Sequence, residues 1–193
     1  MDNASRDLSF YPLTPHRWAD FERLFGPRGA CGGCWCMFWK LSRTDFERMK
    51  GEGNRQAQKS AVDSGEVPGL LAYRAGEPVA WCAVAPRSAY PGLARSRILK
   101  PLDDEPVWSI TCFFVAKDSR RSGLTVHLLR AAVDYVARHG GRIVEGYPTE
   151  PRRAQAPPAF VYTGLASAFR QAGFLELARR SETRPIFRCV IRS

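Results

Sequence analysis

Residues 113–125, FFVAKDSRRSGLT, join an apolar segment to a helix through small and basic side chains. The near-continuous apolar run at 107–116 predicts a central strand that is covered on both faces. The first N–H groups of a following helix have no partner within it and lie at the positive end of its dipole, so they attract anions. Gly123 permits a close approach to the main chain, and Arg120 and Arg121 add positive charge. A tight turn with solvated arginines explains the same residues, so both interpretations stay open.

The common nucleotide-binding patterns are absent from this junction. No Walker motif is present, and the six-position G-x-G-x-x-G pattern cannot be placed because Gly123 is the only glycine between Val115 and Arg138. The sequence therefore does not support binding of ATP or NAD.

The composition is that of one compact domain. The chain has 193 residues, of which 45% are hydrophobic and 25% are charged, which predicts a single domain spanning 1–193. The longest apolar stretches, such as 79–85 and 110–116, fall far short of the roughly 20 residues that cross a bilayer. The first residues lack both the basic start and the apolar core of a secretory signal. We therefore expect a cytoplasmic protein that has no membrane partner.

The charge points to an anionic partner. The formal net charge is +10, and residues 151–193 contain eight arginines and two glutamates. Nucleic acid, an anionic cofactor and an acidic substrate satisfy this charge equally well, because electrostatic attraction carries little chemical identity. No run of five basic residues occurs.

Periodicity and turn signals predict an α/β domain. Helices are expected at residues 14–25, 42–49, 54–65, 124–139 and 163–172, with Ser42 or Thr44 capping the second and Asn54 capping the third. Strands are expected at residues 8–13, 69–74, 79–84, 107–116, 143–148, 174–179 and 186–191, and long connections at 86–106 and 150–158. Hairpins give antiparallel pairs, whereas a strand, helix, strand unit gives a parallel pair. The prediction is a central mixed, mostly antiparallel sheet flanked by helices.

Six cysteines stand at positions 31, 34, 36, 82, 112 and 189. The last three lie on strand-like segments, where a free thiol behaves as a small hydrophobic group. Cys31, Cys34 and Cys36 form the cluster CGGCWC, but a structural zinc site needs four ligands and no second ligand pair follows. We therefore expect no metal. A redox pair of Cys31 and Cys34 is an alternative that a reducing cytosol opposes.

The junction resembles a known family. Arg120-x-x-Gly123-x-Thr125, which follows the apolar strand, resembles the R/Q-x-x-G-x-G/A motif of the GNAT acyltransferases, except that Thr125 replaces Gly or Ala. The stretch FRQAGF at 169–174 is similar to the helix-end Y-x-x-x-G-F of the family, and the order of the expected elements agrees. CGGCWCMFW at 31–39, with EGYP at 145–148 and RPI at 184–186, resembles a bacterial subgroup whose substrate is unassigned.

The resemblance implies that acetyl-CoA is the co-substrate. In this family the amides of the loop hold the coenzyme pyrophosphate, and an amide of the splayed fourth strand, here around Phe114 and Val115, meets the thioester carbonyl. The residues expected to bind the coenzyme are therefore Phe113, Phe114, Val115, Arg120, Arg121, Ser122, Gly123, Leu124 and Thr125.

An amine acceptor also needs a base, and the departing thiolate is helped by an acid. Glu145, on the strand next to the fourth, is the candidate base, although a glutamate paired with one of the many arginines is an equal alternative. Phe169 stands where the family has its acidic tyrosine, so Tyr162 or Tyr147 is the candidate replacement. Each tyrosine can instead be a packing residue.

The cysteine and aromatic cluster is expected to border the acceptor. In the GNAT order this loop joins the first two helices, so Cys34, Trp35, Phe38 and Trp39 are candidates for an apolar or cation-binding wall. The alternative is that these aromatic residues belong to the core.

Two classes of function follow. The first is an N-acetyltransferase that transfers an acyl group from acetyl-CoA to a small-molecule or peptide amine, acting as a monomer or homodimer. The alternative is a non-catalytic GNAT-fold binding or regulatory protein, with nucleic acid as a less expected partner.

Overall fold

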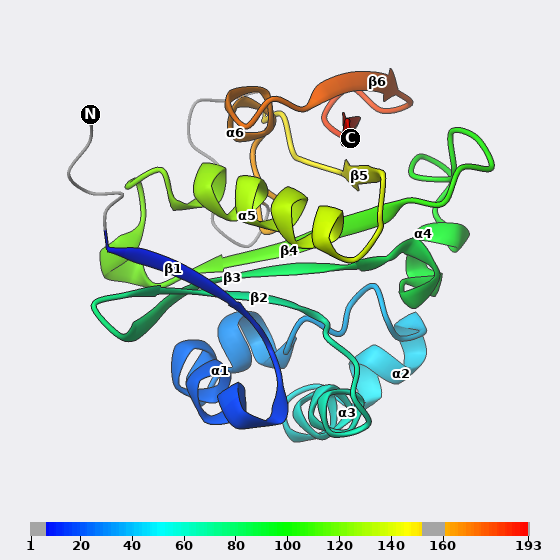
Figure 1. Cartoon of the computed structure of the whole chain (residues 1–193). Helices are drawn as coiled ribbons and strands as arrows, with labels where there is room; N and C mark the ends of the chain where they lie inside the picture. Colours follow the sequence, from blue (N-terminus) through cyan, green and yellow to red (C-terminus); the bar gives the residue numbers. More distant parts are fainter. Residues whose placement is uncertain (1–6, 152–160, 193) are drawn as a thin grey trace.

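The computed structural model describes residues 7–151 and 161–192. One seven-stranded sheet crosses the molecule in the order β1-β2-β3-β4-β5-β7-β6 (Figure 1). Its strands are β1 (Leu8–Pro12), β2 (Gly69–Arg74), β3 (Glu77–Pro86), β4 (Trp108–Val115), β5 (Ile143–Gly146), β6 (Leu175–Arg179) and β7 (Pro185–Val190). Every neighbouring pair is antiparallel except β4 with β5, which are parallel. The predicted α/β fold with a mixed, mostly antiparallel sheet is confirmed.

Helices cover both faces of the sheet (Figure 1). The α-helices are α1 (Trp18–Phe25), α2 (Arg43–Arg48), α3 (Glu52–Asp63), α4 (Pro91–Arg95), α5 (Leu124–Arg138) and α6 (Ala166–Gln171). α5 packs its apolar face on β2, β3 and β4, while α1 packs on the opposite face of β3. Of the helices described, none is long and apolar enough to span a membrane.

The sequence signals at the first two helices act as expected. Pro15 opens a short 3-10 helix at Pro15–Arg17, because its fixed φ suits a first turn. α1 continues from it and buries Trp18, Phe21 and Phe25. The Ser42 side chain caps α2 by accepting a hydrogen bond from the Asp45 main-chain N–H.

Two expectations, the cap of α3 and the connection at 86–106, need correction. Asn54 does not cap α3, because the helix begins two residues earlier and Gly51 takes the cap position. The long connection at 86–106 is partly helical, with a 3-10 turn at Arg87–Ala89 followed by α4. Of the expected loop at 150–158, residues 152–158 lie outside the described residues.

Asn54 instead ties α3 to the cysteine-containing loop at 29–37. Its side chain is fully buried, and its Nδ2 donates to the Gly33 carbonyl at 3.1 Å. The Gly33 carbonyl also accepts the Gly51 N–H at 3.0 Å. A side chain at position 33 would have its Cβ 2.4 Å from the Gly51 nitrogen, so only glycine permits this approach. The loop is therefore held by packing and by main-chain hydrogen bonds.

β4 contains the irregularity that shapes the rest of the molecule. Cys112 lies opposite Ala83 and Ile110 lies opposite Val84, so Thr111 is an extra residue that has no partner on β3. β5 pairs with β4 only at Trp108–Ile110. Beyond this point the edge of β4 is open toward β5, and the Phe113 N–H is bound by the Tyr162 carbonyl at 2.6 Å.

We expect Asn54→Ala to lower the free energy of unfolding by about 1–3 kcal/mol, because the Gly33 carbonyl and the surrounding buried polar groups lose a partner. Ser60→Ala, at an exposed position of the same helix, is the matched control and should change it by less than about 0.5 kcal/mol. Urea unfolding of both variants measures the difference. Equal stabilities would show that Asn54 does not anchor the loop.

Candidate functional site

The turn between β4 and α5 is built from residues in unusual backbone conformations. Arg121 has φ +62° and Gly123 has φ +75°, and Gly123 occupies the N-cap position of α5. The Ser122 hydroxyl donates to the Ser119 carbonyl at 2.7 Å. Arg120 Nε donates to the Val115 carbonyl at 3.1 Å, so one of the predicted coenzyme residues holds another in place.

The main-chain N–H groups of this turn are available to a ligand. Within the described part of the chain, the N–H groups of residues 121–125 have no hydrogen-bond acceptor. Five consecutive free donors at the N-terminus of a 15-residue helix make a favourable site for a phosphate group. Arg121 is exposed beside them and forms no ion pair with any described residue. This geometry fits a pyrophosphate.

The open edge of β4 presents the main chain of alternate residues. The Ala116 N–H binds the Val79 carbonyl on β3, so by alternation the Phe114 N–H also points to β3. Phe113 and Val115 face the open edge, because the first donates to Tyr162 and the second accepts from Arg120. The expectation that Phe114 offers its amide there is therefore wrong, and its ring packs on Phe25 at 5.2 Å. Of the two amides directed to the open edge, that of Phe113 is bound by Tyr162, so the Val115 amide is the remaining one.

Glu145 and Tyr147 lie together in a buried polar network. One Glu145 oxygen accepts Arg87 Nη1 at 3.0 Å and the Tyr147 hydroxyl at 2.7 Å, and the other accepts Arg188 Nε at 2.6 Å. Tyr147 in turn lies 2.9 Å from the Ser109 hydroxyl. Neither Glu145 nor Tyr147 has measurable solvent exposure.

Glu145 is therefore paired with arginines, which was the alternative to its being the catalytic base. Three donors occupy most of the roughly four lone-pair sites of its carboxylate, and the residue is fully buried, so it is not exposed to an incoming amine. Burial raises the pKa of Tyr147, and the Tyr147 hydroxyl already donates its hydrogen bond to Glu145. The structure thus brings these two predicted residues together, but not at the open edge of β4.

Tyr162 stands at that edge. Its carbonyl binds the Phe113 N–H, and its ring lies 6.3 Å from the Phe38 ring in an edge-to-face arrangement. Burial raises the pKa of Tyr162 to about 12, while the charge of Arg184 acts in the opposite direction. The hydroxyl is therefore protonated at neutral pH.

The predicted acceptor wall divides into two parts. Phe38 is 42% exposed, and its ring contacts those of Trp39 and Tyr162, while the Cys34 thiol is close enough to influence the Tyr162 pKa. Burial raises the pKa of Cys34 itself to about 12, so it is a neutral thiol. Trp35 is different, because only 4% of it is exposed and its ring stacks on Phe25 at 5.7 Å. It belongs to the core under α1.

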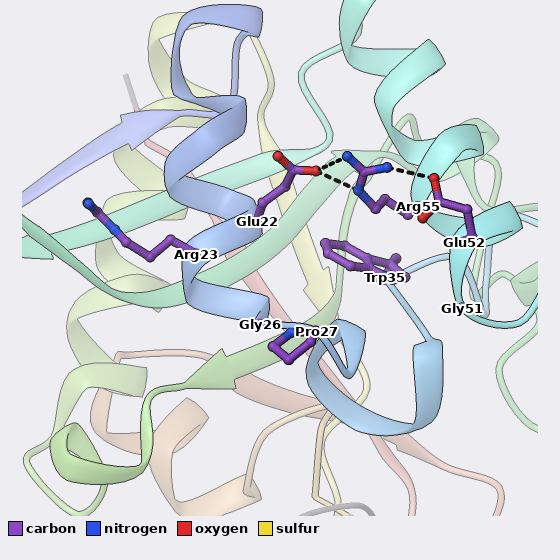
Figure 2. Close-up of a pocket in the computed structure, with 8 residues that line it drawn as sticks. All are labelled: Glu22, Arg23, Gly26, Pro27, Trp35, Gly51, Glu52 and Arg55. Carbon is purple, nitrogen blue, oxygen red and sulfur yellow. Dashed lines mark hydrogen bonds and ion pairs between the residues drawn. The ribbon is translucent and has the colours of Figure 1, made fainter.

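Trp35 also forms the floor of a separate open hollow of about 560 Å³ (Figure 2). There Arg55 lies between two carboxylates, binding Glu22 through Nε at 2.5 Å and Glu52 through Nη1 at 2.6 Å. Arg23 extends away from this group. The charges in the hollow are thus mutually paired, and the residues that line it include neither Tyr162 nor the turn at 117–123.

The six cysteine side chains are free thiols in this structure. Across residues 7–151 and 161–192, no group of three or more His, Cys, Asp or Glu side chains is arranged to hold a metal ion. The Cys36 thiol accepts a hydrogen bond from Trp81 Nε1 at 3.1 Å. Cys36 therefore packs against β3 as a small hydrophobic residue.

Two features of the site were not predicted. The bulge at Thr111 has no sequence signal, because the strand is continuously apolar on either side of it. Arg184 lies beside Tyr162, and the resemblance at RPI 184–186 marked this arginine without giving it a role.

Comparisons with solved structures agree with this fold. An acetyltransferase of the GNAT family from Streptococcus agalactiae superposes with a TM-score of 0.58 at 12% identity, covering 97% of this chain and 98% of that one. The protein yncA from Salmonella typhimurium, solved with acetyl-CoA, gives a TM-score of 0.52 at 11% identity, covering 96% and 94%. AAC(6')-Ib in complex with paromomycin and acetyl-CoA gives 0.55 at 16% identity, covering 95% and 93%.

No curated protein matches the sequence. The model of the acetyltransferase (GNAT) family matches residues 35–156, which include the open edge of β4 and the turn into α5. This match covers well over half of the chain, and the matched residues include the bulged strand and the turn with the free amides. The chain belongs to the acetyltransferase (GNAT) family.

Proposed function

We propose that this protein is an N-acetyltransferase that uses acetyl-CoA as its co-substrate. The observation that carries the proposal is the run of free N–H groups at 121–125, at the start of α5 and directly after the open edge of β4. The family match and the neighbours solved with acetyl-CoA support it.

Each part of the junction has a distinct task in this proposal. The N–H groups of Arg121, Ser122, Gly123, Leu124 and Thr125 hold the pyrophosphate, and the side chains of Arg120 and Arg121 add positive charge. Val115 donates its N–H at the open edge, where Phe113 and Phe114 form the apolar surroundings. When bound there, the coenzyme supplies a thioester whose carbonyl carbon is attacked by an amine.

Tyr162 is the proposed acid. It is at the open edge, it is protonated at neutral pH, and its hydroxyl is not committed to a carboxylate as that of Tyr147 is. Its proton passes to the thiolate as the sulfur leaves, and the proton that the acceptor amine loses returns to Tyr162 through solvent. Glu145 and Tyr147 are positioning residues, because Glu145 holds β5 against β7 through Arg188, and the Tyr147 hydroxyl is bound to Glu145 and Arg87 inside the fold.

The basic C-terminal region does not favour the nucleic-acid alternative. Arg170 and Arg179 pair with Glu150 and Glu176, and Arg188 pairs with Glu145. Three of the eight arginines at 151–193 are therefore neutralised within the fold, which lowers the positive charge available to a nucleic acid.

Acetyl-CoA at about a hundred times its dissociation constant should raise the unfolding temperature by roughly 5 °C, since ligand binding adds about 2.7 kcal/mol to the native state. Gly123→Glu should abolish this shift, because the new carboxylate would occupy the space that a phosphate needs. Thermal unfolding with ATP at matched ionic strength controls for general anion binding.

Gly140→Glu is the matched control variant. Gly140 lies just beyond the other end of α5 with the same φ of +75°, and a Cβ at either position meets nothing within 4 Å. The two variants thus carry similar backbone strain, but only one disturbs the proposed site. Loss of the acetyl-CoA shift in both variants, or an equal shift with ATP, would refute the assignment of the pyrophosphate site.

Tyr162→Phe should lower kcat by roughly 10- to 100-fold, because the thiolate then leaves without a proton donor. The dissociation constant of acetyl-CoA should stay unchanged, since the hydroxyl does not hold the coenzyme. Steady-state kinetics and a binding titration measure the two quantities. Tyr11→Phe, at an exposed position on β1, serves as the control. An unchanged kcat in Tyr162→Phe would remove the tyrosine from the mechanism.

Glu145→Gln should lower the free energy of unfolding by about 3 kcal/mol, because two buried guanidinium groups lose their shared counter-charge. The acidic limb of the pH profile of kcat/KM should keep its midpoint, since Glu145 is not the base. Glu176→Gln, in an exposed cluster of ion pairs, should cost less than about 1 kcal/mol. A shifted acidic limb with unchanged stability would instead make Glu145 the base.

A further inference from the structure

Arg184 is a half-buried cation at the candidate acceptor site. It follows the β6–β7 turn and directly precedes β7. Its Nη1 donates to the Thr163 hydroxyl at 2.7 Å, and Thr163 Oγ1 lies 3.3 Å from Thr149 Oγ1. Its charge acts on the neighbouring Tyr162 hydroxyl. The guanidinium therefore lies close to the residue that we propose as the acid.

No carboxylate of the described residues is paired with this guanidinium. Arg87 and Arg188, the other arginines that enter the interior near β5, both pair with Glu145. Arg184 forms no ion pair with any residue of the described ranges, and its recorded side-chain partner is a neutral hydroxyl. The sequence from 151 to 163 contains no Asp or Glu. A partly desolvated cation without a counter-charge has a strong preference for an anion.

The other groups around Tyr162 are neutral or apolar. Phe38 and Trp39 supply aromatic rings, and the Cys34 and Cys112 thiols that influence Tyr162 both have pKa values raised above their ordinary range. The indole N–H of Trp39 acts as a hydrogen-bond donor on the Tyr162 hydroxyl and lowers its pKa, and it has no other acceptor among the residues that the structure describes. Among the described residues, Arg184 is thus the charged group of the cluster.

We propose that Arg184 binds the carboxylate of the acceptor, and that the acceptor is a free amino acid with an apolar side chain. This inference rests on the proposed acetyltransferase function and specifies its substrate class. A guanidinium can hold a carboxylate through two parallel hydrogen bonds, which orients the amine as well as binding it. The aromatic rings of Phe38 and Trp39 then contact the apolar side chain.

The proposal separates this chain from a structural neighbour that acts on cations. AAC(6')-Ib was solved with paromomycin, and it is described as an aminoglycoside acetyltransferase. Aminoglycosides carry several ammonium groups, which an unpaired guanidinium repels. We expect paromomycin to be a poor acceptor for this protein.

The test compares amino acids with their carboxamides as acceptors. The pairs are glycine with glycinamide, L-leucine with L-leucinamide and L-phenylalanine with L-phenylalaninamide, with acetyl-CoA as the donor. Arg184→Ala should lower kcat/KM for the acids by roughly 10- to 100-fold, and it should leave kcat/KM for the amides within about 3-fold. The ratio between wild type and variant cancels the difference in amine pKa between an acid and its amide.

Two further variants separate charge from folding. Arg184→Lys should retain part of the preference for acids, because the positive charge remains while the two-point hydrogen bonding is lost. Arg180→Ala removes another arginine of the same turn, which binds only the Lys100 and Pro101 carbonyls. It should leave the preference unchanged.

Several outcomes would overturn the inference. These are equal losses for acids and amides in Arg184→Ala, a preference for paromomycin, or an acetyl-CoA thermal shift with no transfer to any of the acids. In the first two cases the proposed acetyltransferase function stands, because acetyl transfer to an amine is still observed. In the third case the acetyl-CoA site stands, and transfer to one of the amides or to paromomycin decides whether the acetyltransferase function stands as well. Absence of the thermal shift in wild type would instead refute the proposed function itself, so the two failures are distinguishable.

Discussion

Strands β4 and β5 pair over three residues and then part, and the unpaired edge of β4 determines what surrounds it. Main-chain polar groups that leave a sheet ladder in a protein interior must find other partners. Here the Phe113 N–H takes the Tyr162 carbonyl, and the Val115 carbonyl takes Arg120 Nε. The same unmet hydrogen bonds thus bring the candidate acid and the basic turn to one edge, although they are about forty residues apart in the sequence.

At the opposite end, where β4 and β5 are paired, ion pairs to Glu145 connect neighbouring segments. Arg87 follows β3, Arg188 lies on β7, and both bind Glu145 of β5. Arg188 also binds Asp103 at 2.6 Å, and this hydrogen bond holds the pKa of the Asp103 carboxyl below its usual range. The connection between β3 and β4 is therefore fastened to β7. The pair of β4 and β5 thus has one end that is held by ion pairs and one end where the edge of β4 is unpaired.

The sequence was sufficient for the elements that depend on local patterns. The apolar run of β4, the periodic face of α5 and the glycines around them each follow from side-chain chemistry alone, and all are found in place. The run of small and basic residues also located the turn that we propose as the pyrophosphate site. Its five free amides follow from backbone conformation at Arg121 and Gly123, of which only the glycine is a recognisable signal.

The tertiary partners of individual side chains could not be predicted in this way. From the sequence Glu145 is a candidate base, because nothing local indicates that Arg87 and Arg188 bind it. Trp35 reads as part of the same wall as Phe38, but positive φ angles at Trp35 and Cys36 turn the chain so that one ring enters the core and the other faces outward. Asparagine often caps helices, yet α3 begins before Asn54, and the Asn54 side-chain amide makes a long-range contact instead. Such outcomes depend on which distant segments meet.

The loop at 29–37 has one more property that follows from its packing. Of the six thiols, Cys31 alone is exposed, whereas the others are buried or half-buried. Maleimide or iodoacetamide reagents should therefore modify this position first under native conditions. Cys31 is two residues from Gly33, which is hydrogen-bonded to Gly51 and Asn54. A fluorophore attached there would report on movement of the loop beside the acceptor site without any cysteine being introduced or removed.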